Sequence, residues 1–154
     1  IGYVGETNCE NRYDGYRDFL KEKQLPFDSS YVASEPLTSN GGYDGAMKLL
    51  KQQPRLTAMF CGDDIAAIGV LRAIRDFGLK VPDDMSVIGI DDIETSQFLS
   101  PMLTTIHVPM EEMGQLAAKM LIDRIDGGHT LPMKINLPFY LAKRESCAKP
   151  RSLD

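Results

Sequence analysis

The stretch TAMFCGDDIAAIGVLRAIRDFG, residues 57–78, joins a short apolar run to an amphipathic run through a Gly-Asp-Asp turn. The first part, 57–61, has the length and apolar character of a buried strand. In the second part, apolar residues recur at helical spacing as far as Gly78, a residue type that commonly ends helices. Asp63 or Asp64 can accept hydrogen bonds from the free amides at the start of this helix. A buried strand followed directly by a helix is the repeating unit of a parallel sheet.

The same alternation of strand and helix continues on both sides of this unit. Further strands are predicted at 1–5, 31–34, 85–90 and 104–108, and further helices at 12–23, 42–53 and 109–125. The segment 133–141 is expected to be extended, although Pro138 argues against a central strand there. We therefore predict an α/β fold in which a parallel sheet is flanked by helices.

The composition is typical of a folded domain that does not itself grip nucleic acid. Hydrophobic residues make up 43% of the 154 residues, which is enough for a packed core. The 17 basic and 22 acidic residues give a net charge of −5, which argues against binding to phosphates. The longest apolar run, 65–71, is far too short to span a bilayer.

The cysteines and the first residues suggest where the chain comes from. Cys9, Cys61 and Cys147 form no Cys-x-x-Cys pair and cannot all pair internally, which favours a reduced, intracellular protein. Residue 1 is Ile, a strand is already in progress at 1–5, and no charged leader precedes it. We therefore expect a piece of a longer chain, with any upstream function outside it.

The candidate binding residues lie in the loops that follow the predicted strands. Ligands of an open parallel sheet bind beyond the carboxyl ends of its strands. These loops are 6–11, 35–41, 62–64 and 91–94. Their carboxylates can accept hydrogen bonds from hydroxyl groups, while the guanidinium of Arg12 can donate two in a fixed fork. This mixture suits a small polyhydroxy ligand.

Each of these residues also has a simpler interpretation. Asp63 and Asp64 can serve only as helix caps, and Asp91 and Asp92 can form a polar strand end. Arg12 can be a solvated side chain in the first turn of a helix. Both interpretations remain open from the residues alone.

The sequence carries no signal for catalysis, a metal or a cofactor. It contains no G-x-S-x-G elbow, no G-x-G-x-x-G turn and no Walker loop. His107 and His129 lack metal-ligand spacing and are expected to be structural or exposed. Cys61 is expected to pack inside its strand. We predict a protein that is not an enzyme and has no catalytic residues, no metal site and no cofactor.

Several segments resemble LacI/GalR-type transcription regulators. The similar blocks are 60–74, 78–92 and 99–106, followed by the C-terminal signature Lys143-Arg144-Glu145-Ser146. The resemblance implies a periplasmic-binding-protein-like effector domain made of two α/β lobes with a small molecule between them. It implies that 1–107 and 131–146 form most of the C-terminal lobe and that 108–130 crosses to the N-terminal lobe. A DNA-binding helix-turn-helix and the start of the N-terminal lobe would precede this chain.

The resemblance also implies the residues of the effector site. The effector contacts would be Arg12, Asp63, Asp91 and, more weakly, Leu37 and Met110. Asp63 occupies a position where the family often has Asn, Ser or Thr, so the ligand is expected to offer more donors there. Asp64 matches the family's usual Asp, interpreted as a helix cap and structural anchor. Leu37 replaces an aromatic residue that stacks on the sugar ring in many relatives.

The partners implied are a small-molecule effector, expected to be a sugar, operator DNA bound through the missing N-terminal domain, and a second copy of the chain. The homodimer interface would include Ile68, Arg72, Gln97 and Leu99. The function expected is that of a cytoplasmic regulator, expected to be a repressor, with no membrane partner.

Two other functions are weighed against this regulator. A periplasmic-type sugar-binding protein of a transport system would share the fold but would need a secretory leader. A Mg²⁺-dependent phosphoacceptor or phosphatase would use strand-end aspartates, but it would need a carboxylate on an early strand and a lysine on a later one. Here the first strand ends in Gly5-Glu6, which disfavours that enzyme class.

Overall fold

One mixed sheet organises the chain in the computed structural model, which describes residues 1–7, 10–53 and 56–150. The sheet has six strands in the order β2-β1-β3-β4-β5-β6. They are β1 (Gly2–Gly5), β2 (Val32–Ser34), β3 (Ala58–Cys61), β4 (Ser86–Asp91), β5 (Thr104–His107) and β6 (Tyr140–Ala142). The first five run parallel and β6 is antiparallel to β5. The predicted α/β fold is confirmed.

The helices follow the strands as the alternating pattern predicted. They are α1 (Glu10–Glu22), α2 (Ser39–Gln52), α3 (Asp64–Asp76) and α4 (Met110–Ile125), with short 3₁₀ helices at Ser29–Tyr31 and Glu94–Gln97. The start predicted for α2, residue 42, is wrong by three residues. The helix begins earlier because the Thr38 hydroxyl accepts a hydrogen bond from the Gly41 amide at 3.0 Å and caps its first turn.

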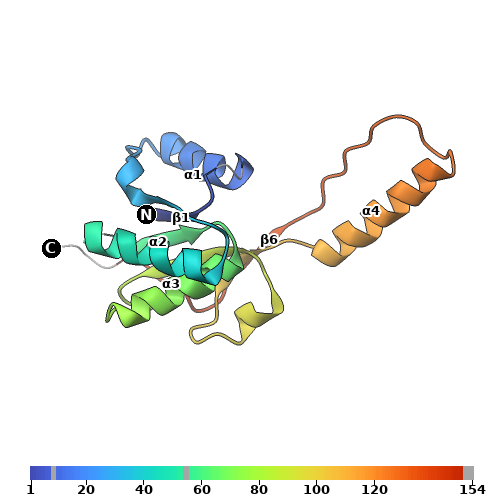
Figure 1. Cartoon of the computed structure of the whole chain (residues 1–154). Coiled ribbons are helices and arrows are strands. Elements are labelled where there is room, and N and C mark those ends of the chain that lie inside the picture. The colour runs from blue at the N-terminus through green and yellow to red at the C-terminus, as the bar shows by residue number, and fades with distance from the viewer. Residues whose placement is uncertain (8–9, 54–55, 151–154) are drawn as a thin grey trace.

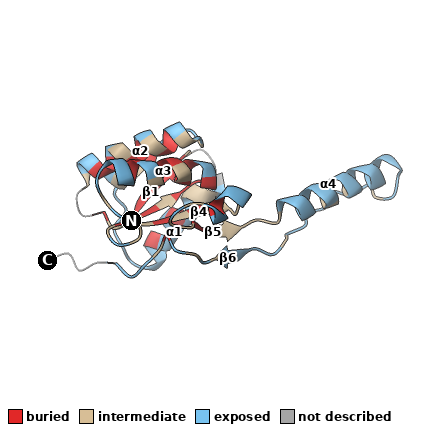
Figure 2. Ribbon diagram, turned by 90° about the horizontal axis from the view of Figure 1, so that it is seen from below, coloured by how far each residue is buried: buried red, intermediate tan, exposed pale blue. Residues whose placement is uncertain are grey.

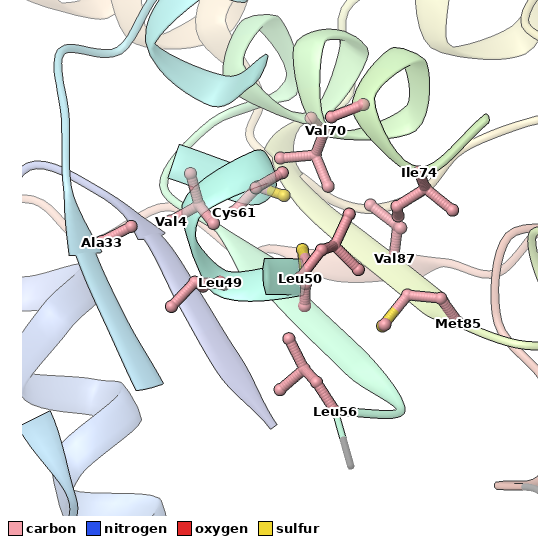
Figure 3. Packing of buried hydrophobic residues seen from close by; sticks show 14 of the residues in the cluster. Val4, Ala33, Leu49, Leu50, Leu56, Cys61, Val70, Ile74, Met85 and Val87 are labelled. Atoms are coloured by element: carbon pink, nitrogen blue, oxygen red, sulfur yellow. The ribbon is translucent and has the colours of Figure 1, made fainter. Parts of the chain in front are cut away.

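Helices α2 and α3 cover one face of the sheet and enclose the main core (Figure 1). Figure 3 shows side chains from both helices meeting those of the strands, including Val4, Leu49, Val70 and Val87. The two helices approach closely, because a Cβ atom at Gly42 or Gly69 would collide with the backbone of the other helix. Cys61 is fully buried in this core, as predicted.

Helix α1 covers only part of the opposite face (Figure 2). Its Tyr16 and Leu20 pack on Tyr3 of β1, with the rings of Tyr3 and Tyr16 5.7 Å apart. Phe19, which precedes Leu20 on the same helix, is 45% exposed. Four apolar side chains of the same face, Phe60, Ile88, Ile90 and Ile106, line an open cavity beside α1.

Residues 108–139 project away from the sheet, and we call them the arm (Figures 1 and 2). The arm consists of α4 and an extended return segment, and no residue of α4 is buried. The extended segment expected at 133–141 pairs as a strand only from Tyr140, where β6 meets β5. Throughout the part of the chain that the structure describes, no helix has the length and apolar character needed to cross a membrane.

Candidate functional site

The carboxyl ends of β1, β3 and β4 meet at one edge of the sheet, where Arg12 reaches across from α1. The Arg12 Nη1 group donates to the carbonyl oxygen of Gly62 at 2.6 Å. Its Nη2 group donates to Asp91 Oδ1 at 3.1 Å, which also makes an ion pair. Arg12 and Asp91 are 79 residues apart in sequence, so the parallel topology alone brings them together. Residues 8 and 9 of the first loop lie outside the described residues, and so does Cys9.

The Asp91 carboxylate occupies an environment that disfavours its charge. Burial raises the pKa of Asp91, the Arg12 guanidinium opposes this effect, and the carboxylates of Asp63 and Asp64 raise the pKa further. The Asp91 carboxyl group is therefore influenced by one guanidinium and by two other carboxylates. An additional anion would be repelled here, whereas hydroxyl and amine groups could donate to the free carboxylate oxygens.

The two aspartates after β3 have separate roles. Asp63 caps α3, because its Oδ1 accepts a hydrogen bond from the Ala66 amide at 2.6 Å. Asp64 is fully buried and accepts hydrogen bonds from Thr105 Oγ1 at 2.6 Å and from Ser96 Oγ at 2.7 Å. Asp64 therefore anchors α3 to neighbouring segments, as the resemblance implied, but its interpretation as the helix cap is wrong.

Leu37 and Met110 are placed differently relative to this edge. Leu37 lies over Gly62, because a Cβ atom at Gly62 would be only 2.7 Å from Leu37 Cδ2. Met110 is the first residue of α4, at the base of the arm, and is 51% exposed. The structure thus gathers Arg12, Asp63, Asp91 and Leu37 at the strand ends and sets Met110 on the arm. Their role as effector contacts stays a prediction.

The residues predicted for a dimer interface lie on α3 and on the segment after β4. Arg72 is exposed, with its guanidinium 4.9 Å from the Tyr43 ring centroid, and Ile68 is half-buried beside it on the same helix. Gln97 is exposed, whereas Leu99 is half-buried and packs on the main core of its own chain. Their part in a dimer stays a prediction.

A second polar cluster at the base of the arm was missed by the reasoning from sequence. Arg144 Nη2 donates to Asp92 Oδ1 at 2.5 Å, and His107 Nδ1 lies 2.9 Å from Asp92 Oδ2. Burial opposes ionisation of Asp92, but the hydrogen bonds from Arg144 and His107 outweigh it and hold the pKa of Asp92 below its usual range. The sequence indicated Asp92 only as a polar strand end and Arg144 only as part of a C-terminal signature. No sequence pattern predicted that these two residues are in contact.

The remaining reactive side chains of the described residues form no metal site. Among residues 1–7, 10–53 and 56–150, no group of three or more His, Cys, Asp or Glu side chains could hold a metal ion. Burial raises the pKa of the Cys61 thiol well above its usual range, which makes it a poor nucleophile.

The periplasmic binding protein-like domain family matches residues 1–147. The chain belongs to this family. Its curated relatives include the "HTH-type transcriptional repressor PurR" of Photorhabdus laumondii, 43% identical over 80% of this chain and 36% of that protein. The protein of the same name from Yersinia pestis is 36% identical over 96% of this chain and 43% of its own length. The chain thus spans less than half the length of these curated relatives.

Solved structures of transcriptional regulators, LacI family members among them, share the fold of this periplasmic-binding-protein-like chain. The "transcriptional regulator CelR-cellobiose complex" has a TM-score of 0.91 and 31% identity, covering 95% of this chain and 46% of that one. A LacI family regulator from Enterococcus faecium with bound ribose has a TM-score of 0.89 and 33% identity, covering 99% and 57%. The resemblance to LacI-type regulators is therefore confirmed.

Proposed function

We propose that this chain is the effector-binding and dimerisation region of a LacI-type DNA-binding transcriptional regulator, a repressor that responds to a sugar or a related small molecule. The observation that carries the proposal is the Arg12–Asp91 pair, held over the Gly62 carbonyl at the carboxyl edge of the parallel sheet. This edge is where ligands of open α/β sheets bind. The curated relatives are transcriptional repressors by name, which supports a regulator over a transport protein.

The chemistry of the edge favours a neutral ligand rich in hydroxyl groups. The Asp91 carboxylate can accept hydrogen bonds from adjacent hydroxyls, and Arg12 can donate to a ring or hydroxyl oxygen. The neighbouring Asp63 adds negative charge, so anionic ligands are disfavoured. Two structurally similar regulators hold cellobiose and ribose, ligands of this neutral, polyhydroxy class.

The arm connects this lobe to a second one in the proposed arrangement. Residues 1–107 and 131–146 would form most of the C-terminal lobe, with 131–139 returning along the arm to β6, and 108–130 would cross to the N-terminal lobe. The exposed apolar side chains of α4, among them Leu121 and Ile125, would then be covered by that lobe. Met110, at the base of the arm, would contact the effector from the side of the crossing.

The same proposal gives the chain its macromolecular partners. Ile68, Arg72, Gln97 and Leu99 would lie in a homodimer interface, and operator DNA would be bound by an N-terminal helix-turn-helix. A repressor of this kind acts in the cytoplasm. The effector would alter operator affinity by binding one arrangement of the two lobes better than another.

The test is to measure effector binding by the intact regulator. Neutral mono- and disaccharides, including ribose and cellobiose, are titrated into it in a calorimeter. We expect Arg12→Ala and Asp91→Asn each to weaken binding about 10- to 100-fold, because each removes a charge-assisted hydrogen bond. Arg75→Ala is the matched control, since Arg75 is an exposed arginine on α3, paired only with Asp76 in the described structure. Wild-type affinity in both site variants would overturn the site assignment.

A further inference from the structure

The side chain of Asp92, the residue that follows Asp91, is held by two partners. Asp92 Oδ1 accepts from Arg144, which follows β6, and Asp92 Oδ2 faces His107 at the end of β5. Arg144 Nη1 also donates to the Leu103 carbonyl at 2.8 Å, so the guanidinium is fixed by two partners. The Asp92 side chain is only 8% exposed, and this shielding strengthens its charge-assisted hydrogen bonds.

Asp91 and Asp92 both have left-handed backbone conformations, with φ of 115° and 57°. Residues with side chains rarely adopt such conformations, and two in succession persist only where the surroundings hold them. The hydrogen bonds to Asp92 supply such a restraint, and the Arg12–Asp91 contact lies one residue away.

The same contacts connect this turn to both ends of the arm. His107 is the last residue of β5, immediately before the arm, and its antiparallel partner is Tyr140, the first residue after the arm. The two rings stack with centroids 4.5 Å apart. His107 therefore contacts Asp92 and Tyr140, and its partner in the β4–β5 register is Asp91. Arg144 binds the other carboxylate oxygen of Asp92.

We propose that Asp92 is a positioning residue: held by Arg144 and His107, it fixes the left-handed turn that aims the Asp91 carboxylate at Arg12, and it ties that aim to the base of the arm. A displacement of the arm would move His107 and the segment after β6 that carries Arg144, and the turn would relax with them. The inference rests on the proposed effector site for its biological meaning. It adds a set of contacts that couples the position of the arm to the orientation of the Asp91 carboxylate.

The experiment follows the Arg12 guanidinium in the ligand-free 154-residue chain by NMR, measuring hydrogen exchange of its Nη groups. Arg144→Met and His107→Gln break the cluster from the arm side without altering Arg12 or Asp91. We expect exchange to rise about tenfold in Arg144→Met and by a smaller factor in His107→Gln. Lys143→Met is the matched control, because Lys143 is the exposed neighbouring cation, and it should leave exchange unchanged.

A second set of variants separates positioning from general stability. Arg144→Met leaves a poorly exposed carboxylate without its cation, so this variant can fail to fold. The double variant Asp92→Asn/Arg144→Met removes that charge as well, and Asn tolerates the left-handed conformation. We expect Arg12 exchange to be fast in the double variant and faster in Asp92→Ala than in Asp92→Asn, while amide exchange in β1 and β3 stays as in the wild type.

Two results would overturn the proposal. One is wild-type exchange at Arg12 in folded His107→Gln and in the double variant. The other is a rise in exchange at Arg12 that is matched throughout β1 and β3, which would show only global destabilisation. Because no ligand is present, either result leaves the proposed effector site to be judged by the sugar titrations alone.

Discussion

Two regions of the molecule contain similar apolar residues but differ in how far these residues are buried. One region is the sheet with α2 and α3, and the other is the arm. Leu49 on α2 is fully buried, whereas Leu121 on α4 is 60% exposed. The four-residue strands β1 and β3 are flanked by strands on both sides, while β6 has three residues at the edge of the sheet. An apolar pattern thus marks a side chain that can be buried, and the topology decides what buries it.

This difference explains why one sequence produces both a stable layer and an unpartnered helix. Helix α3 is covered by α2 and by the strands, and Asp64 links it to Ser96 and Thr105. Helix α4 holds its shape through its own backbone hydrogen bonds, and no residue in it is buried. Helices without tertiary packing are marginal in water, so the two helices should differ widely in stability.

The largest expected difference concerns the two leucines. Leu49→Ala should lower the free energy of unfolding by about 3 to 4 kcal/mol, because it opens a cavity in a packed core. Leu121→Ala, the same substitution on the arm, should change it by less than about 0.5 kcal/mol. Urea denaturation followed by circular dichroism measures both, and equal losses would show that the arm is packed in solution.

A smaller contrast is expected between two aspartates. Asp64→Asn should cost about 2 to 3 kcal/mol, since the amide replaces an acceptor that binds three donors: Thr105, Ser96 and the Ile93 amide. Asp123→Asn removes the charge from an exposed acceptor of His129 on the arm and should cost less than about 1 kcal/mol. The comparison uses the same denaturation assay, and a cost for Asp64→Asn no larger than that for Asp123→Asn would contradict the anchoring role.

Excision of the arm should have a still smaller effect on the lobe. His107 and Tyr140 are paired in antiparallel register, so a short Gly-containing turn in place of 109–138 can close a hairpin between β5 and β6. The shortened chain should keep the free energy of unfolding within about 1 kcal/mol, because α4 buries no residue. Its amide exchange in β3 and β4 should match that of the full chain. Loss of the cooperative transition would show that the arm covers the open sheet face in solution.

The fold was predictable because its strongest signals are local. The run 57–78 predicted β3, α3 and the stop at Gly78, whose φ of 87° is the left-handed conformation that glycine adopts easily. The start of α2 was missed because a Thr38 cap outweighed the low helix propensity of Gly41 and Gly42. The lack of cover over α4 was not predictable, since the hydrophobic pattern contains no information about what packs against it.

The candidate site was predictable only in part. The rule for parallel strands placed Arg12, Asp63 and Asp91 at one edge, and the structure brings Arg12 and Asp91 into contact. The Asp92 cluster was not predictable, because Arg144 lies 52 residues away and arrives through an antiparallel strand after the arm. Which of Asp63 and Asp64 caps α3 depended on a one-residue difference in where the helix begins, which is beyond the precision of sequence patterns.

The finest contrast lies between the adjacent residues Asp91 and Asp92, whose pKa values shift in opposite directions. The pKa of Asp91 is raised in the folded chain, so its ionised form opposes folding, and this cost appears as the pH rises through that value. The pKa of Asp92 is lowered, so its ionised form stabilises the folded chain. This stabilisation is present above the ordinary Asp value of about 3.9 and is lost as the pH falls.

Asp91→Asn should therefore raise the urea midpoint at pH 7, and Asp92→Asn should lower it. Both differences should shrink toward pH 3, where the wild-type carboxyl groups take up protons. Shifts of the same sign at pH 7 would show that the two carboxylates share one environment, and that burial rather than the partners Arg144 and His107 governs Asp92.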